Sequence, residues 1–253
     1  MPGAPPSGHR GALPSGRDGP HVFVDDVEHP LLDEGDRHHL ERVLRVRPGD
    51  PITVSDGRGR WRPCRMAPVD GDAVPEPAGP VIAVERPGPS LTIAFALTKG
   101  ERPELTVQKL TELGVDRILL FTAARSVVRW DEGRGARNTE RLRRVAREAA
   151  MQCRRVHLPE VDGVAAFATA AALEGAALAE RDGGPPDLRH PTVLVGPEGG
   201  WDDAERALGL PSVRLGTHVL RAETAAIAAG VLLTALRAET VRTARGIRGI
   251  RGD

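Results

Sequence analysis

Two glycine-bearing loops in the C-terminal third of the chain carry the residues best suited to bind a ligand. The first, residues 195–201, reads V-G-P-E-G-G-W, and the second, residues 215–224, reads L-G-T-H-V-L-R-A-E-T. Each follows a short apolar run of the kind that forms a buried strand. Because glycine lacks a Cβ, such loops let a ligand approach the backbone closely and offer it bare N–H and C=O groups. The two loops therefore predict a site for an adenine or a ribose.

Other nucleotide-binding loops are excluded. No G-x-x-x-x-G-K-[ST] motif occurs, and the two lysines, Lys99 and Lys109, lie outside both loops, so a phosphate-cradling P-loop is absent. No G-x-G-x-x-G follows a predicted strand either. This excludes a dinucleotide fingerprint and the glycine-rich loop of an ordinary Rossmann-like methyltransferase.

Cysteine and histidine give no sign of a metal site. Cys64 and Cys153 are far apart and show no paired spacing, so neither a disulfide framework nor a zinc site is expected. His38 and His39 are adjacent, but no carboxylate or cysteine pattern accompanies them. No apolar run approaches membrane-spanning length. We therefore expect a soluble cytoplasmic protein without a metal.

Arginine is concentrated in two bands, although the chain is neutral overall with 35 basic and 35 acidic residues. Residues 37–65 hold eight arginines against three acidic residues, and residues 125–155 hold ten against four. Each band alone is explained by a solvated face, but two bands beside a ligand site favour phosphate contacts with RNA. With no tyrosine, four phenylalanines and three tryptophans, recognition of shape and backbone is favoured over base stacking.

Local patterns predict two domains. Strands at 21–24, 52–54, 61–66 and 81–84, an Asp-Gly turn at 56–57 and a short helix around 38–45 indicate a small β-rich domain. From residue 91 strands and helices alternate, which predicts a largely parallel sheet covered on both faces. The expected strands are 91–97, 117–121, 192–195 and 213–215, with a possible one at 176–179, and the expected helices are 103–113, 138–153, 164–173 and one from Thr224. Asp202 and Glu205 form a capping box.

The order and spacing of the two loops resemble a known family. G-P-E-G-G at 196–200, then L-G at 215–216 and V-L-R-A-E-T-A at 219–225, are similar to the C-terminal signature of the SPOUT methyltransferases. Within that class the chain resembles the 16S ribosomal RNA uridine-N3 methyltransferases. H-H-L-x-x-V-L-R at 38–45, followed by P-G-D, is similar to the N-terminal PUA-like RNA-binding domain of the same family. The resemblance covers roughly residues 21–240.

The resemblance implies an α/β fold with two domains. A trefoil-knotted SPOUT methyltransferase domain is expected at 89–245, and a smaller β-rich PUA-like domain, with a β-barrel, at 21–88. Residues 1–20 are rich in Pro, Gly and Ser and are expected to be a disordered tail, and residues 246–253 a frayed one. The family also implies a homodimer through the knotted domain and 16S ribosomal RNA within the small subunit as the partner.

The resemblance further implies S-adenosylmethionine as the methyl donor. The residues expected to bind it are Val195, Gly196, Pro197, Glu198, Gly199, Gly200, Leu215, Gly216, Val219, Leu220, Arg221 and Thr224. The residues expected to bind RNA are Arg42, Arg45, Lys99, Arg125, Gln152 and Arg155.

Methylation of uridine N3 requires alignment of N3 with the methyl group and removal of the N3 proton. Arg221 is our candidate for the cation that stabilises the developing uracil anion, and Glu223 for positioning or proton acceptance. An equally weighted alternative is that Glu223 only caps a helix starting at Thr224.

Two other functions stay open from the sequence. A SPOUT enzyme of this kind can act on another RNA site, including a ribose hydroxyl. A non-catalytic RNA-binding or ribosome-assembly factor that retains affinity for the methyl donor is the other possibility.

Overall fold

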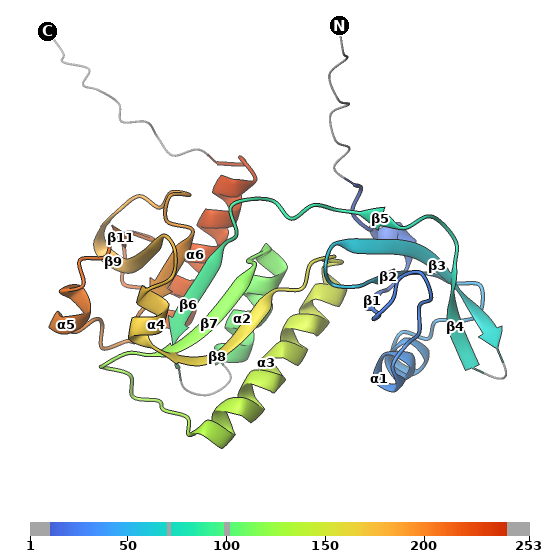
Figure 1. The fold of residues 1–253 in the computed structure, drawn as a ribbon, viewed down its shortest axis with the longest axis horizontal. Helices are drawn as coiled ribbons and strands as arrows, with labels where there is room; N and C mark the ends of the chain where they lie inside the picture. The colour runs from blue at the N-terminus through green and yellow to red at the C-terminus, as the bar shows by residue number, and fades with distance from the viewer. Residues whose placement is uncertain (1–10, 70–71, 99–101, 242–253) are drawn as a thin grey trace, which may run out of the picture. The chain divides into compact units, whose positions relative to one another are not determined.

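The computed structural model describes residues 11–69, 72–98 and 102–241 (Figure 1). They belong to two compact units. One consists of residues 1–86 together with 148–158, and the other of residues 87–147 together with 159–253. The segment 148–158 therefore belongs to the N-terminal unit, although its place in the sequence put it in the C-terminal domain.

The N-terminal unit is built on a five-stranded sheet with the order β1-β2-β3-β4 and with β5 paired to β3. Its elements are η1 (Gly16–Asp18), β1 (His21–Phe23), α1 (Glu34–His38), the π-helical turn η2 (His39–Val43), β2 (Pro51–Ser55), β3 (Arg60–Val69), β4 (Asp72–Pro77) and β5 (Ile82–Ala83). β1 and β2 are parallel, and the other pairs are antiparallel. Alternate apolar residues of β2 and β3 pack with Leu40 in one core. The predicted β-rich domain is thus present.

Residues 11–20, which we expected to be disordered, lie against this sheet. The indole Nε1 of Trp61 donates a hydrogen bond to the Ala12 carbonyl at 2.9 Å. Ser15 and Asp18 form a reciprocal capping box around η1. The composition of this segment suits a disordered chain, but a capped turn and one buried indole partner hold it in place.

The C-terminal unit is built on a six-stranded sheet with the order β11-β9-β10-β6-β7-β8. The strands are β6 (Thr92–Ala96), β7 (Arg117–Thr122), β8 (Glu160–Ala166), β9 (Ala176–Gly184), β10 (Thr192–Val195) and β11 (Ser212–Val213). Every pair in this sheet is parallel, as predicted. The carboxyl ends of all the strands consequently lie at one edge, where α/β folds place their ligands.

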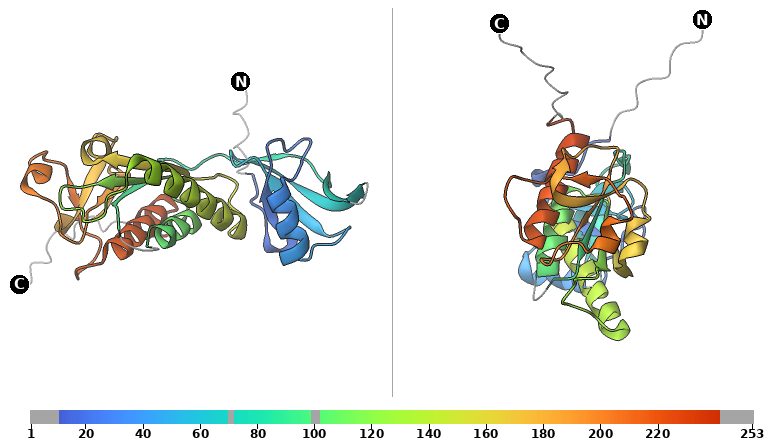
Figure 2. Two further views of the ribbon diagram at one scale, coloured as in Figure 1. Left: turned by 90° about the horizontal axis from the view of Figure 1, so that it is seen from below. Right: turned by 90° about the vertical axis from the view of Figure 1, so that its left-hand side faces the viewer.

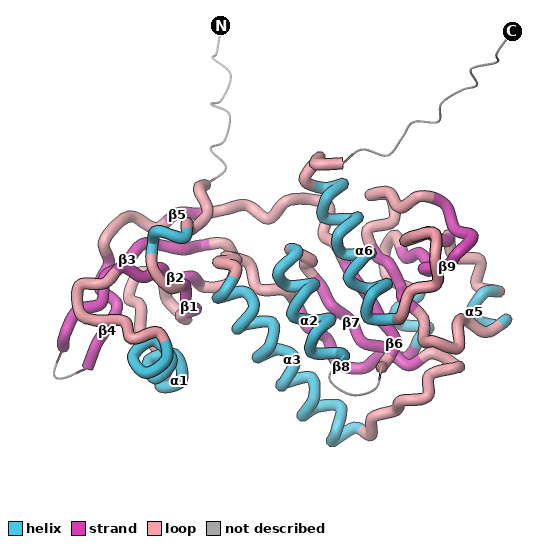
Figure 3. Tube along the Cα trace, turned by 180° about the vertical axis from the view of Figure 1, so that it is seen from behind, coloured by secondary structure: helices cyan, strands magenta, loops and turns pink. Residues whose placement is uncertain are grey.

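Helices cover both faces of this sheet. α2 (Arg102–Leu113), α3 (Glu132–Gln152) and α6 (Ala222–Arg237) lie over one face. In Figure 3 this face is turned toward the viewer. α4 (Phe167–Ala171) packs on the other face, and α5 (Asp203–Arg206) follows the first glycine loop. Alternation along β6 serves both layers: Ile93 and Phe95 join the core under α2 and α6, while Ala94 and Ala96 join the opposite core.

Two helices differ from their predicted bounds. α3 begins at Glu132 instead of 138, because the Asp131 carboxylate accepts the Arg134 N–H at 2.8 Å and caps the helix early. The predicted helix 164–173 is wrong over its first three residues, which belong to β8. Their pairing with β7 supplies backbone hydrogen bonds that outweigh the helix propensity of alanine.

The C-terminal end of α6 is fixed by a buried ion pair. Arg237 donates to Asp116, and the two side chains are 8% and 3% exposed. Arg237 also donates to the carbonyls of Gly114, at 2.7 Å, and Pro89, at 3.2 Å. α6 lies beside α2 (Figure 2), so this pair anchors the helix that follows the second glycine loop.

Candidate functional site

The two glycine loops meet in one pocket at the carboxyl edge of the sheet of the C-terminal unit. The pocket has a volume of about 480 Å³. The predicted residues that line it are Val195, Gly196, Pro197, Glu198, Gly200, Leu215, Gly216, Val219 and Leu220. Gly199, Arg221 and Thr224 do not line it. Two loops that residues 202–214 separate in the sequence are thus brought together by the ends of β10 and β11.

A buried tryptophan supports the first loop. The ring of Trp201 stacks on Phe121 with centroids 6.0 Å apart, and its Nε1 donates to the Ala179 carbonyl at 3.2 Å. A Cβ on Gly196 would lie 3.1 Å from this indole, so glycine is what allows the loop to pass over the ring. Gly200 has a φ of +70°, a conformation that also favours glycine. The loop is therefore rigidly seated rather than a free hinge.

Glu205 joins the first loop to the loop after β7. The predicted capping box is confirmed: Asp202 accepts the Glu205 N–H at 2.8 Å, and Glu205 Oε2 accepts the Asp202 N–H at 2.9 Å. Glu205 Oε1 also accepts the N–H of Ala124 at 2.8 Å. Glu205 is 5% exposed, and both of these partners of its carboxylate are backbone N–H groups. It consequently fixes the start of the 124–131 loop beside the pocket.

Gly199 packs against Arg125 instead of facing the pocket. Arg125 Nη1 donates to the Gly199 carbonyl at 3.1 Å, and a Cβ on Gly199 would meet the Arg125 Cβ at 3.2 Å. Arg125, which the sequence assigned to RNA, is exposed at this place. Gly199 therefore lets the first glycine loop pack closely against the 124–131 loop.

Arg102, which sequence reasoning missed, lies between acidic residues of both loops. Its Nη1 is 3.1 Å from Glu198 Oε1, and its Nε is 3.6 Å from Glu223 Oε1. Glu223 is 13% exposed at the side chain, and its Oε2 is buried with no hydrogen-bond partner among the described residues. A buried acceptor without a partner is costly, although Glu223 itself does not line the pocket.

The second loop leads directly into α6. The helix begins at Ala222, and Arg221 is its N-cap residue, with an extended backbone and no capping side-chain hydrogen bond. The alternative that Glu223 caps a helix starting at Thr224 is therefore wrong. Glu223 stands in the first turn, where its charge is favourable to the helix dipole. Arg221 and Thr224 are exposed.

Nine further residues line the pocket that the sequence analysis did not assign to the methyl donor, although Trp201, His218 and Ala222 belong to the two loops. They are Ala179, Glu180, Arg181, Asp182, Trp201, Arg206, His218, Ala222 and Ala225. Four of them stand at the end of β9, which runs five residues beyond the predicted strand. These four residues could have been predicted from the rule that ligands bind at the carboxyl ends of parallel strands, because β9 is the strand next to β10.

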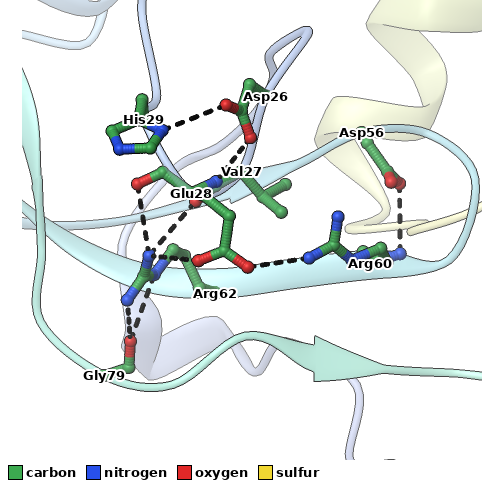
Figure 4. A network of polar contacts seen from close by, with 8 residues as sticks. All are labelled: Asp26, Val27, Glu28, His29, Asp56, Arg60, Arg62 and Gly79. Atoms are coloured by element: carbon green, nitrogen blue, oxygen red, sulfur yellow. Dashed lines mark hydrogen bonds and ion pairs between the residues drawn. The ribbon is translucent and has the colours of Figure 1, made fainter.

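Some arginines of the first band, residues 37–65, are paired with other groups of the protein, and others have no such partner among the residues that the structure describes. Figure 4 shows Glu28 between Arg60, whose Nη2 lies 2.8 Å from Oε1, and Arg62, whose Nη1 lies 3.4 Å from Oε2. Arg62 also donates from Nε to the Gly79 carbonyl at 3.1 Å. Arg42 and Arg45 are exposed and form no such contact with a described residue, and Arg45 has a φ of +55°. These two keep the exposure that a phosphate contact needs.

Three further residues predicted to bind RNA are Lys99, Gln152 and Arg155. Gln152 is exposed at the end of α3, and Arg155 is half-buried, and both belong to the N-terminal unit. Lys99 lies outside the described residues. Among the described residues no group of His, Cys, Asp and Glu could hold a metal ion, and none of the helices is long and apolar enough to span a membrane.

Comparison with known proteins identifies the family. A model of the RNA methyltransferase domain matches residues 85–234, and a model of the RNA methyltransferase PUA domain matches residues 32–74. The ribosomal RNA small subunit methyltransferase E of Mycobacterium bovis is 35% identical over 219 residues, which cover 79% of this chain and 83% of the relative. The chain belongs to the ribosomal RNA small subunit methyltransferase E family.

Solved structures of similar proteins share the fold of this family. A probable rRNA methyltransferase from Porphyromonas gingivalis is 26% identical and has a TM-score of 0.74, covering 88% of this chain and 100% of its own. The family member from Neisseria gonorrhoeae, solved bound to S-adenosyl methionine, is 25% identical and has a TM-score of 0.71, covering 86% and 97%. The predicted α/β SPOUT methyltransferase domain with a smaller PUA-like domain is confirmed.

Proposed function

We propose that this chain transfers a methyl group from S-adenosylmethionine to N3 of a uridine in the 16S RNA of the small ribosomal subunit. The observation that carries the proposal is the single pocket formed by both glycine loops, with Arg102 between an acidic residue of each. The Neisseria gonorrhoeae relative was solved with the same methyl donor bound, which supports the choice of ligand.

The pocket fits S-adenosylmethionine in size and chemistry. Its volume of about 480 Å³ lies within the usual range for small-ligand sites. Leu215 and Leu220 offer an apolar wall for the adenine ring, and Gly196 and Gly216 leave backbone groups accessible to it. The Asp182 carboxylate supplies negative charge for a cationic sulfonium and acceptors for ribose hydroxyls, whereas Glu180 is paired with Arg206. We assign cofactor contacts to the nine predicted residues that line the pocket, with Gly199, Arg221 and Thr224 adjacent.

When bound, S-adenosylmethionine supplies an electrophilic methyl group, so the protein needs only to orient the uridine and manage its N3 proton. Glu223 is our candidate for the second task, because its buried Oε2 is unpartnered and Arg102 stabilises the charge on the other oxygen. Arg221, at the N-cap of the same helix, is our candidate for the cation that stabilises negative charge on the uracil.

We further propose a homodimer through the knotted domain and a cytoplasmic location, as the resemblance implies. Exposed apolar side chains on two adjacent helices support the dimer: Leu105 on α2 is 45% exposed, and Val231 on α6 is 43% exposed. Light scattering of Val231→Glu against the parent protein tests it. A dimer that is unchanged in this variant removes α6 from the interface.

Nucleoside mass spectrometry tests the reaction. Purified protein is incubated with labelled S-adenosylmethionine and small subunits from a strain that lacks the enzyme, and the expected product is 3-methyluridine in 16S RNA. Label on a ribose hydroxyl or another base moves the chain to a different RNA target. Binding of the donor without any transfer of label supports the non-catalytic assembly factor.

Two substitutions test the assigned roles. Removal of a charge-stabilising donor typically lowers kcat by about 100-fold to 1000-fold, which we expect for Arg221→Ala. Loss of proton acceptance in Glu223→Gln is expected to cost about 100-fold. The matched control is Arg214→Ala, since Arg214 is exposed ahead of the second loop and does not line the pocket. Full turnover in Arg221→Ala, or in Glu223→Gln, removes that residue from the chemistry.

A further inference from the structure

A second hollow, which we call the groove, lies at the same edge of the parallel sheet. It has a volume of about 1160 Å³. Its walls are the carboxyl ends of β7 and β8, at Thr122 and Ala166, the loop before α3, and the first half of α3. Every lining residue belongs to the C-terminal unit, as does the cofactor pocket. Because β10, β6, β7 and β8 are neighbours in this order, one sheet edge carries both hollows.

Arginines in this groove differ in how far they are engaged by the protein. Arg143 pairs with Glu140, and its Nε donates to the Val161 carbonyl at 3.0 Å. Arg129, Arg137 and Arg144 also line the groove, are exposed, and form no ion pair with any described residue.

The acidic residues of the groove offset these charges only in part. Asp131 accepts the backbone N–H of Arg134 as the helix cap, and Glu140 pairs with Arg143. Glu132 is the remaining carboxylate of the lining. The lining thus holds four arginines against three carboxylates, a net charge of 4 − 3 = +1, and the three guanidinium groups that form no ion pair with a described residue stay available to an anionic ligand.

One tryptophan lines the groove beside these arginines. Trp130 is half-buried and packs against the core of the C-terminal unit. Trp61 and Trp201, the other two tryptophans of the chain, are 5% and 2% exposed. An indole held by the core on one side and open on the other offers a base a stacking surface, while nearby guanidinium groups contact phosphates.

We propose that this groove binds a single-stranded segment of the substrate RNA next to the target nucleotide. Arg137 and Arg144 contact its phosphates, and Trp130 stacks on one of its bases. The inference rests on the proposed function for the identity of the RNA. The groove's own chemistry, with unpaired guanidinium groups and one aromatic face, specifies single-stranded RNA as the ligand class.

Direct binding tests the groove without relying on methyl transfer. The probe is a ten-nucleotide single-stranded RNA, titrated into the full-length protein while tryptophan fluorescence is recorded. Since Trp130 is the accessible indole, the RNA is expected to quench emission, and Trp130→Phe is expected to lose this quenching while weakening binding about tenfold.

The phosphate contacts are tested by the salt dependence of the dissociation constant. The double variant Arg137→Ala/Arg144→Ala is expected to raise the dissociation constant about 30-fold. It is also expected to reduce the slope of log affinity against log salt by about 1.4, that is about 0.7 per contact. Arg134→Ala is the matched control, because Arg134 is exposed on the same helix but does not line the groove. It is expected to change neither quantity by more than about twofold.

Outcomes against the proposal are distinct. Equal affinity and slope in the double variant, the control and the parent protein overturn it. Loss of a dimer in the double variant with unchanged RNA affinity overturns it too, by assigning the groove to a second copy of the chain.

In methylation assays the double variant is expected to raise KM for small subunits and leave KM for S-adenosylmethionine unchanged. If the parent protein methylates no RNA, the proposed function fails, while the fluorescence titration still decides what the groove binds.

Discussion

The two arginine bands look alike in sequence but differ in the folded protein. In residues 37–65, Arg60 and Arg62 share Glu28, and Arg62 and Arg65 donate to backbone carbonyls. In α3, Arg141 and Arg143 are ion-paired, but Arg137 and Arg144 have no ion-pair partner among the described residues and line the groove. The difference shows that the content of arginine predicts a charged region, whereas the partners of each guanidinium decide whether it can bind a ligand.

The largest expected effect on stability is that of Arg237, whose guanidinium group is buried and held entirely by protein groups. Arg237→Ala leaves Asp116 buried without its partner, which typically destabilises a protein by about 3–5 kcal/mol. The control is Arg189→Ala, whose exposed pair with Asp187 is worth no more than about 1 kcal/mol. Urea unfolding measures both. Equal midpoints would show that the buried pair is not what holds α6.

His21 tests whether a second-band arginine also acts structurally. Burial, together with the charge of Arg154, lowers the pKa of His21 to about 4. Arg154 itself donates to the Gly19 carbonyl within the N-terminal unit. The unfolded chain takes up the proton near pH 6.5 and the folded one only near pH 4, so stability falls as the pH drops through this window.

The loss attributable to His21 approaches about 3 kcal/mol. Unfolding measured at pH 6.5 and pH 4.5 is expected to show a smaller decrease in His21→Gln than in the parent protein, since other acidic groups titrate equally in both. Parallel curves for the two proteins would contradict the lowered pKa.

Arg62 sharpens the contrast within the N-terminal band. Arg62→Ala removes hydrogen bonds to the Gly79 and Val27 carbonyls and leaves buried acceptors, so we expect a loss of about 1–3 kcal/mol. Arg137→Ala is expected to change the free energy of unfolding by less than about 0.5 kcal/mol. Thermal unfolding of the two variants side by side measures this. A larger loss in Arg137→Ala would reverse the comparison.

Arg42 and Arg45 give the smallest expected effect on stability. Both are exposed, and their replacement by alanine is expected to stay within about 0.5 kcal/mol. If they contact RNA, as the sequence led us to expect, the double variant weakens binding of small subunits and lowers its salt dependence, with donor affinity unchanged. Unchanged subunit binding would restrict phosphate contacts to the C-terminal unit.

Local sequence patterns predicted much of the fold. The capping box of Asp202 and Glu205, the strand at 192–195 and the helix at 103–113 follow from neighbouring residues and agree with the structure within a residue. The start of α3 was missed because two glycines in its first turn argue against a helix, while the cap on Asp131 outweighs them. The longer course of β9 was missed because the pairing of Gly184 with Val213 of β11 extends it through an Asp-Gly sequence typical of a turn.

By itself, the sequence determined the family, the fold class, the two glycine-bearing loops and the bands of positive charge, because these are properties of residue type and spacing along the chain. Only the tertiary structure decided that Gly199 faces Arg125, that Arg102 lies between Glu198 and Glu223, and that Trp130 shares a groove with unpaired arginines. The physical reason is that these contacts join residues far apart in sequence. Their distances depend on how parallel strands bring loop ends together at one edge of a sheet.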